Sequence, residues 1–338
     1  MSRITIRDVA RIANVSVTTV SNVLNKTGRT SPETMRKVEQ VMEELQFVPS
    51  TSARNLRDKK SHLIGVIVPF LEKGRLKDNP FYWQLLSAIE EGTRSHQFHL
   101  ILFGADENES FSFVHERHLD GLIVIGTFDN SPVLERLLQL NVPCVFMDSY
   151  LSDPKLAQVN IDDQAGGHLG TKHLLGLGHR RIAVLSGVLQ HNGVSHERWL
   201  GYRRALEEAG IPYDPSLVLQ EPVSLEGGYH AGLKAATLPA EERFTAVFAF
   251  SDVGAIGFMK AMHDLGISVP DQMSIVGFDD IFLSPYIPVS ITTVKQDLIE
   301  KGQAAVNMLL SQIHGESTDN CKHVLPVSLS VRNSTKAL

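Results

Sequence analysis

The sequence has little cysteine and no long apolar run. Its two cysteines, Cys144 and Cys321, are too few for a disulfide scaffold in a chain of 338 residues, and we expect both as reduced thiols. No apolar stretch approaches the roughly 20 residues that a membrane span requires. Arg3, Arg7 and Asp8 interrupt the start of the chain, where a secretory signal needs an apolar core. These absences exclude a disulfide-rich secreted protein and a membrane protein, and they predict a cytoplasmic one.

Motifs for catalysis and cofactor binding are missing as well. The segment GLGHRR at 176–181 lacks the third glycine of a dinucleotide-binding fingerprint, and the chain has no Walker A lysine motif and no GxSxG elbow. His168, His173 and His179 lack a cysteine or acidic cluster at the spacing of a zinc site. We therefore expect no enzyme, no cofactor and no metal.

The net charge of -6 is divided unevenly along the chain. Of 32 Lys and Arg and 38 Asp and Glu, residues 1–60 hold 11 and 6, which leaves 21 and 32 for residues 61–338. The first part therefore carries +5 and the rest -11. Because basic side chains bind DNA phosphates, we expect nucleic-acid contacts only in the first part.

Residues 4–25 have the pattern of two short helices joined by a tight turn. Thr5 is a suitable N-cap for the first helix, with Asp8 at the third position, and Ser16 can cap the second. Apolar side chains at i, i+3 and i+4 of the second helix point inward. Its opposite face then carries Val17, Thr18, Ser21 and Asn22. A third helix is predicted to begin at 31–33, with Ser31 as its cap, Pro32 at its first position and Glu33 in its first turn. It completes the small core of a helix-turn-helix that reads DNA.

These caps and the core VSVTTVSNVLN at 15–25 closely resemble the head of the LacI/GalR family of bacterial transcriptional regulators, and the resemblance extends over nearly the whole chain. It implies a homodimer whose heads, residues 1–49, bind near-palindromic, double-stranded operator DNA. The expected DNA contacts are Thr5, Ser16, Val17, Thr18, Ser21 and Asn22. Asn22 stands where the family commonly has arginine. Asparagine suits adenine, with a phosphate contact as the alternative for this short side chain.

A linker with its own motif follows the head. Residues 50–60 include SARNLR, and an isolated helix this short would be mostly unfolded. In the family, the matching hinge folds only on operator DNA and wedges a leucine into the minor groove. The resemblance therefore implies a hinge helix at 50–60 with Ala53 and Leu56 as DNA contacts, whereas composition alone favours an ordinary flexible linker.

From Leu63 onward, β-branched segments alternate with amphipathic helices in two rounds. Such alternation predicts parallel sheets with right-handed crossovers. The predicted fold is a small all-α helix-turn-helix head plus an α/β periplasmic-binding-protein-like body of two parallel-sheet lobes. The ligand of such a body lies between the lobes, at the carboxyl ends of the strands. We place this effector-binding and dimerisation domain at 61–338, with lobe one at about 61–160 plus 295–322 and lobe two at about 161–291 plus 323–335.

The resemblance also implies the residues of the effector pocket. Arg198 would bind effector hydroxyls or carboxylates, and Asp279 would accept from sugar hydroxyls. Asp148 would face Asp279 from lobe one, and Ser251 and Phe81 would complete the site. The ordinary alternatives are a helix-surface ion pair for Arg198, a turn former for Asp279 and a core ring for Phe81. The expected effector is a small molecule, a sugar or sugar derivative.

Two functions from different classes remain. One is a DNA-binding transcriptional repressor whose operator affinity is controlled by a small-molecule effector. The other is a cytoplasmic sugar-binding receptor with an incidental helical head. The basic head and the hinge motif favour the repressor, and an exported receptor would need the signal that this sequence lacks.

Overall fold

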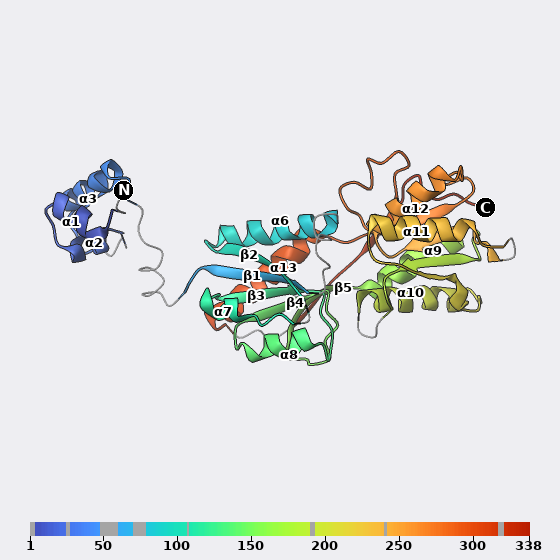
Figure 1. Ribbon diagram of the computed structural model, residues 1–338, viewed down its shortest axis with the longest axis horizontal. Helices are drawn as coiled ribbons and strands as arrows, with labels where there is room; N and C mark the ends of the chain where they lie inside the picture. Colours follow the sequence, from blue (N-terminus) through green and yellow to red (C-terminus); the bar gives the residue numbers. More distant parts are fainter. Residues whose placement is uncertain are drawn as a thin grey trace. The chain divides into compact units, whose positions relative to one another are not determined.

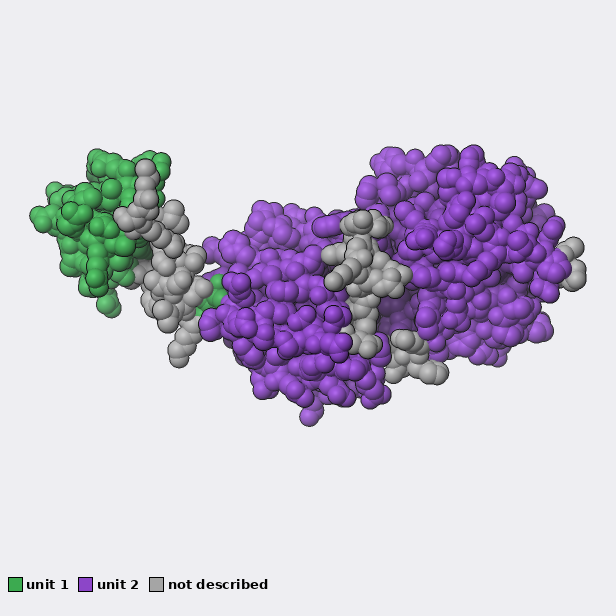
Figure 2. All heavy atoms as spheres, viewed as in Figure 1, with its two compact units in different colours: residues 1–61 green, residues 62–338 purple. Residues whose placement is uncertain are grey.

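The computed structural model describes residues 4–24, 28–47, 60–69, 79–106, 108–189, 193–239, 242–316 and 321–338. The chain divides into two compact units, Met1–Ser61 and His62–Leu338 (Figure 2). Ala53 and Leu56 of the expected hinge helix lie outside the described residues.

The described part of the first unit contains helices α1 (Ile6–Ile12), α2 (Val17–Leu24) and α3 (Pro32–Glu44). Each begins at the cap that the sequence predicts. The N–H and hydroxyl of Thr5 donate to Asp8 Oδ2 at 3.0 and 2.7 Å. The Oγ atoms of Ser16 and Ser31 accept from backbone N–H groups three residues later, at 3.0 and 3.3 Å. These bonds satisfy N–H groups that a helix start leaves without partners.

The three helices of the first unit enclose a small apolar core. The buried side chains come from all three: Val9, Ala10, Ala13, Val20, Val23, Val38 and Val41. Met35, Met42 and Leu45 are partly buried against them. With so little apolar surface to bury, the caps contribute an appreciable share of the stability of this unit, about 1 kcal/mol each.

The described part of the second unit contains two six-stranded sheets (Figure 1). The first has the order β11-β5-β4-β3-β1-β2 and consists of parallel strands β1 (Leu63–Pro69), β2 (His99–Ala105), β3 (Gly121–Ile125), β4 (Cys144–Met147), β5 (Ala157–Ile161) and β11 (Lys322–Leu325). The second has the order β12-β10-β9-β8-β6-β7 and consists of β6 (Ile182–Ser186), β7 (Val218–Gln220), β8 (Ala246–Ala249), β9 (Ser274–Asp279), β10 (Thr292–Lys295) and β12 (Ser328–Ser330). The predicted parallel sheets are confirmed, with one exception at the edge, where β12 runs antiparallel to β10.

Helices cover both faces of each sheet, and each sheet with its helices forms one lobe. In the first lobe, α6 (Pro80–Ser95) and α13 (Leu298–His314) lie on one face, and α7 (Ser112–Glu116) and α8 (Pro132–Gln139) on the other. In the second lobe, α9 (Asp163–Gly176) and α10 (Val194–Glu208) lie on one face, and α11 (Leu225–Ala236) and α12 (Asp252–Asp264) on the other. A short 3-10 helix, η1 (Pro215–Leu217), precedes β7. Among the described residues, no helix combines the length and apolar character that crossing a membrane needs.

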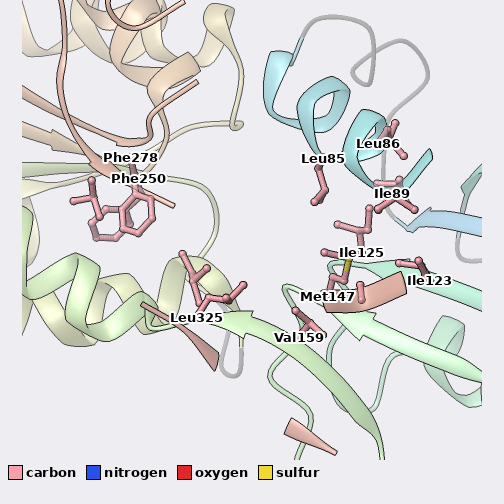
Figure 3. Close-up of a cluster of buried hydrophobic side chains, with 14 of the residues drawn as sticks. Leu85, Leu86, Ile89, Ile123, Ile125, Met147, Val159, Phe250, Phe278 and Leu325 are labelled. Atoms are coloured by element: carbon pink, nitrogen blue, oxygen red, sulfur yellow. The ribbon is translucent and has the colours of Figure 1, made fainter. Parts of the chain in front are cut away.

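The strands alternate their side chains between two apolar layers, as the pleat of a strand requires. In β3, Ile123 and Ile125 join the cluster under α6 and α13, whereas Leu122 and Val124 join the cluster under α7 and α8. The first of these clusters extends into the second lobe, where it includes Phe250 and Phe278 (Figure 3). Apolar packing is therefore continuous from one lobe to the other.

The chain passes between the lobes three times, after β5, β10 and β11. The last crossing follows Leu325, because β11 pairs with β5 of the first sheet, whereas the sequence suggested a boundary near 322. Strand β5 and helix α9, which lead into the second lobe, are elements that the sequence analysis did not assign. The polar residues around these crossings form the candidate effector site.

Helices α9 and α10 approach each other so closely that only glycine fits at the contact. A Cβ atom at Gly167 would lie 1.9 Å from the carbonyl oxygen of Arg198, and one at Gly201 would lie 2.0 Å from that of Gln164. This contact fixes the position of Arg198 against the first turns of α9.

We expect Gly167→Ala to lower the free energy of unfolding by about 1–3 kcal/mol, because the added methyl group overpacks the contact between α9 and α10. Gly176→Ala, at the other end of the same helix, is the matched control, since a Cβ there meets nothing within 4 Å. The control should be neutral or stabilising by up to about 1 kcal/mol. Urea unfolding of the two variants measures both effects; equal stability of the two would contradict the close packing.

Candidate functional site

In the first unit, helix α2 presents a polar face. Val17 and Thr18 are exposed, Ser21 and Asn22 are half-buried, and Val20 of the same helix is fully buried. Thr5 and Ser16 lie at the N-caps of α1 and α2. Several arginines of the unit are exposed: Arg7, Arg11, Arg29 and Arg36. An outward helix face within a basic unit can bring base contacts and phosphate contacts to DNA together.

In the second unit, Arg198 of α10 is buried and held on several sides. Its Nε donates to Asp163 Oδ1 at 2.7 Å, and its Nη1 donates to the carbonyl oxygen of Phe250. The guanidinium carbon lies 3.5 Å from the centroid of the Phe278 ring, within the range of a cation–π contact. Nη2 lies 3.6 Å from Asp279 Oδ1. The alternative of a helix-surface ion pair for Arg198 is therefore wrong.

Asp279 and Asp148 each lie at the end of a strand, one in each lobe. Asp279 ends β9 with φ 116°, and Asp148 follows β4 with φ 50°. Aspartate adopts such left-handed backbone more readily than most residues. Oδ1 of Asp279 accepts from Gln296 Nε2 at 2.7 Å, and Oδ1 of Asp148 pairs with Lys301 Nζ.

These contacts form a continuous series that we call the interlobe ring: Asp148, Lys301, Gln296, Asp279, Arg198, Asp163 and Tyr150. Gln296, on the crossing between β10 and α13, accepts from Lys301 Nζ at 2.9 Å on the side of the first lobe. Tyr150 of the first lobe donates to Asp163 Oδ2 of the second at 2.5 Å. Because Tyr150 and Asp148 lie in one segment, the series returns to its starting point after passing through both lobes.

The interlobe ring contains three carboxylates and two cationic side chains. Burial raises the pKa of Asp279 to about 7, although nearby Arg198 acts in the opposite direction. Burial also raises the pKa of Asp163, again against the effect of Arg198. The pKa of Tyr150 is raised by burial and by the neighbouring Asp163 carboxylate, so this phenol remains a hydrogen-bond donor.

The remaining two expected effector residues lie near the ring with different surroundings. Phe81, near the start of α6, has its ring centroid 5.7 Å from Lys301 Nζ and packs edge-on against Tyr82. Ser251 is the N-cap of α12, and its Oγ accepts from the N–H of Gly254 at 3.1 Å. The hydroxyl oxygen of Ser251 is thus already used by the helix.

Four members of the ring were missed in the sequence analysis. Tyr150 and Asp163 flank β5, the strand that was not assigned. Gln296 lies on a crossing, where no periodic pattern marks it. Lys301 did leave a signal, because it interrupts the apolar stripe of α13 at the spacing Leu298, Lys301, Gly302 and Ala305.

Comparisons with known proteins agree with this architecture. The family model described as bacterial regulatory proteins, lacI family, matches residues 5–50, and that of the periplasmic binding protein-like domain matches residues 171–335. The HTH-type transcriptional regulator DegA of Bacillus subtilis is 36% identical over 342 residues, which cover 99% of this chain and 98% of DegA. The chain belongs to the lacI family. It is thus a DNA-binding transcriptional regulator, as the sequence analysis predicted.

Solved structures of relatives match the fold, one of them over nearly the whole chain. The lac repressor dimer bound to operator and the anti-inducer ONPF has a TM-score of 0.86 and 29% identity, covering 99% of this chain and 100% of that chain. A LacI family regulator from Enterococcus faecium with bound ribose has a TM-score of 0.72 and 30% identity, covering 82% and 99%. These matches confirm the predicted combination of a helix-turn-helix unit and a two-lobed α/β body.

The raised pKa of Asp279 predicts a pH-dependent contribution to stability. The folded chain retains this proton at pH values where an unfolded aspartate, with a pKa of about 4, has lost it. The stabilisation is therefore complete at low pH and is lost as the pH rises through about 7. Asp279→Asn cannot ionise, so its unfolding free energy relative to the unsubstituted chain should rise by about 1 kcal/mol per pH unit between about pH 5 and 7. Denaturant unfolding at several pH values measures this slope, and a constant difference would contradict it.

Proposed function

We propose that this chain is a repressor that binds a near-palindromic operator as a homodimer and whose operator affinity responds to a sugar or sugar derivative bound at the interlobe ring. One observation carries the proposal. A single series of polar contacts connects Arg198 and Asp279 of the second lobe to Asp148 of the first.

The chemistry of the ring suits a polyhydroxylated ligand. Each sugar hydroxyl both donates and accepts a hydrogen bond, and the ring offers carboxylate acceptors beside the guanidinium donors of Arg198. Phe81 adds an aromatic face close to these groups. A ligand that contacts both lobes interacts differently with each of their arrangements, which is the requirement for allosteric control.

The relatives support the same assignment. The Enterococcus faecium regulator was solved with ribose, and the lac repressor was solved as a dimer on its operator. A single helix-turn-helix reads only a half-site, so a two-fold dimer requires a symmetric operator. The alternative, a sugar receptor with an incidental head, is disfavoured because relatives match this chain from the first unit through to the end of the body.

Arg198→Lys tests the effector half of the proposal. Lysine keeps the charge that Asp163 needs but loses the planar fork that lets one guanidinium hold several partners. We expect the sugar concentration for a half-maximal change in operator binding to rise at least about tenfold, because the variant loses one hydrogen bond between a charged group and the sugar. Operator affinity without sugar should stay within about twofold.

The measurement is fluorescence anisotropy of labelled operator with a panel of ribose, other neutral sugars, sugar phosphates and nucleobases. Arg204→Lys, on the exposed face of the same helix, is the matched control and should respond as the unsubstituted chain does. An unchanged response in Arg198→Lys, or no response of the unsubstituted chain to any sugar, would overturn this half of the proposal.

Asn22→Arg tests the DNA half. Arginine pairs with guanine O6 and N7, whereas asparagine suits adenine N6 and N7, and each good pair is worth about 1–3 kcal/mol. The variant should change base preference toward guanine at one symmetric pair of operator positions. Binding selection on randomised half-sites reads this out. The control is Gln40→Arg, which adds the same charge at an exposed position of α3 and should leave every base preference unchanged. If Asn22→Arg also leaves every preference unchanged, Asn22 does not read bases.

A further inference from the structure

A hydrogen bond outside the interlobe ring also joins the two lobes. The backbone N–H of Phe282, in the second lobe, donates to Gln84 Oε1 on α6, in the first lobe, at 3.1 Å. We call this bond the outer contact. Its two residues lie 198 positions apart in the chain. Because a hydrogen bond weakens steeply with distance and angle, the outer contact forms only when the lobes bring α6 close to the segment after β9.

Both ends of the outer contact lie close in sequence to the effector site that we propose. Phe282 is the third residue after Asp279, the member of the interlobe ring that ends β9. Gln84 is the third residue after Phe81, so the two lie about one turn apart on α6. Movement of one lobe's site residues relative to the other's therefore also moves the two ends of the outer contact.

The turn that carries Phe282 depends on hydrogen bonds for its position. The side chains of Phe282 and Tyr286 are 53% and 82% exposed, so they contribute little packing, although Ile281 is buried. The direction of the Phe282 N–H is then set by the groups that bind the turn on either side of it.

Asp252, the first residue of α12, binds the turn on both sides. Its Oδ2 accepts from the N–H of Ile281 at 3.0 Å and from Ser284 Oγ at 2.6 Å. Its Oδ1 accepts from Thr293 Oγ1 at 2.6 Å, on the strand β10 that leads to a crossing between the lobes. One fully buried carboxylate therefore fixes the turn before and after Phe282 and attaches it to β10.

A carboxylate is a costly group at this place. Burial raises the pKa of Asp252 to about 6, and the neighbouring Asp280 acts in the same direction, against the hydrogen bonds from Ser284 and Thr293. An ionised carboxylate only accepts hydrogen bonds, so it can hold three donors at once. Asparagine replaces one oxygen by a donor group and cannot hold the same three.

We propose that Asp252 is a positioning residue of the allosteric switch: it holds the turn at 281–284 so that the outer contact forms, and the outer contact favours one arrangement of the lobes. A contact that is present in only one of two arrangements shifts their populations by its own free energy. The inference rests on the proposed control of operator affinity by an effector between the lobes. It adds the residues that set the balance between the arrangements before any effector binds.

Gln84→Met tests the outer contact from the lobe that Asp252 does not touch. Methionine has a similar length but lacks the amide oxygen that accepts from Phe282. The sugar concentration for a half-maximal change in operator binding should change by about threefold to tenfold, the range for one hydrogen bond. The measurement is fluorescence anisotropy of labelled operator with the tightest-binding neutral sugar of the panel, ribose included. Ser87→Ala, at an exposed position of the same helix, should behave as the unsubstituted chain does.

A double variant separates positioning from a merely structural role of Asp252. Asp252→Asn should change the half-maximal sugar concentration in the same direction as Gln84→Met. Gln84→Met/Asp252→Asn should differ from the larger single effect by less than about twofold, because both changes remove one contact. If Asp252 only stabilised α12, the two effects would multiply. Asp264→Asn, at the other end of α12, is the control and should have no effect.

Hydrogen exchange of the full chain without sugar gives a second measurement. The Phe282 amide should exchange faster in both Gln84→Met and Asp252→Asn, whereas the Ile281 amide should exchange faster only in Asp252→Asn. Ser284→Ala, which removes one of the three donors, replaces Asp252→Asn if that variant does not fold.

The outcomes distinguish this inference from the proposed function. An unchanged half-maximal sugar concentration in Gln84→Met, or effects of Gln84→Met and Asp252→Asn that multiply, would overturn the role of Asp252 while the unsubstituted chain still responds to sugar. No response of the unsubstituted chain to any sugar of the panel would overturn the proposed function, and this inference with it.

Discussion

The buried guanidinium of Arg198 is the constraint on which much of the second unit depends. A charge with so little access to water requires partners on all sides, and these come from α9, β9 and the end of β8. The close contact at Gly167 and Gly201 brings α10 near enough to α9 for Arg198 to reach Asp163. The Phe278 ring covers the flat face of the guanidinium and joins it to the apolar cluster that the two lobes share.

The interlobe ring, our proposed effector site, connects Arg198 to both lobes. It joins the lobes at two places, through Gln296 and through the bond from Tyr150 to Asp163, where a change in the angle between the lobes must be absorbed. A ligand that contacts the ring therefore acts on the same hydrogen bonds as a lobe movement does. We infer that the effector changes operator affinity by favouring one arrangement of these bonds, and the size of its effect is limited by its differential affinity for the two arrangements.

Much of this architecture could be predicted from the sequence because local signals fixed it. Caps at Thr5, Ser16 and Ser31 mark the helix starts, and alternating strands and helices mark the parallel sheets. Arg198, Asp279 and Asp148 were proposed only through resemblance to a family. Lys301, Gln296, Asp163 and Tyr150 were missed, because their roles arise from contacts between residues as many as 153 positions apart in the chain, such as Asp148 with Lys301. Only Lys301 left a local signal, as a charge within an apolar stripe.

The most direct test of the account is the reciprocity of effector and operator binding. Operator affinity is measured over a titration of the tightest-binding sugar, and sugar affinity is measured with and without saturating operator. If both ligands act on one equilibrium of the lobes, each should change the affinity of the other by the same factor, about 5- to 150-fold. Sugar binding that leaves operator affinity unchanged, with no effect of operator on sugar affinity, would contradict control of the operator through the interlobe ring.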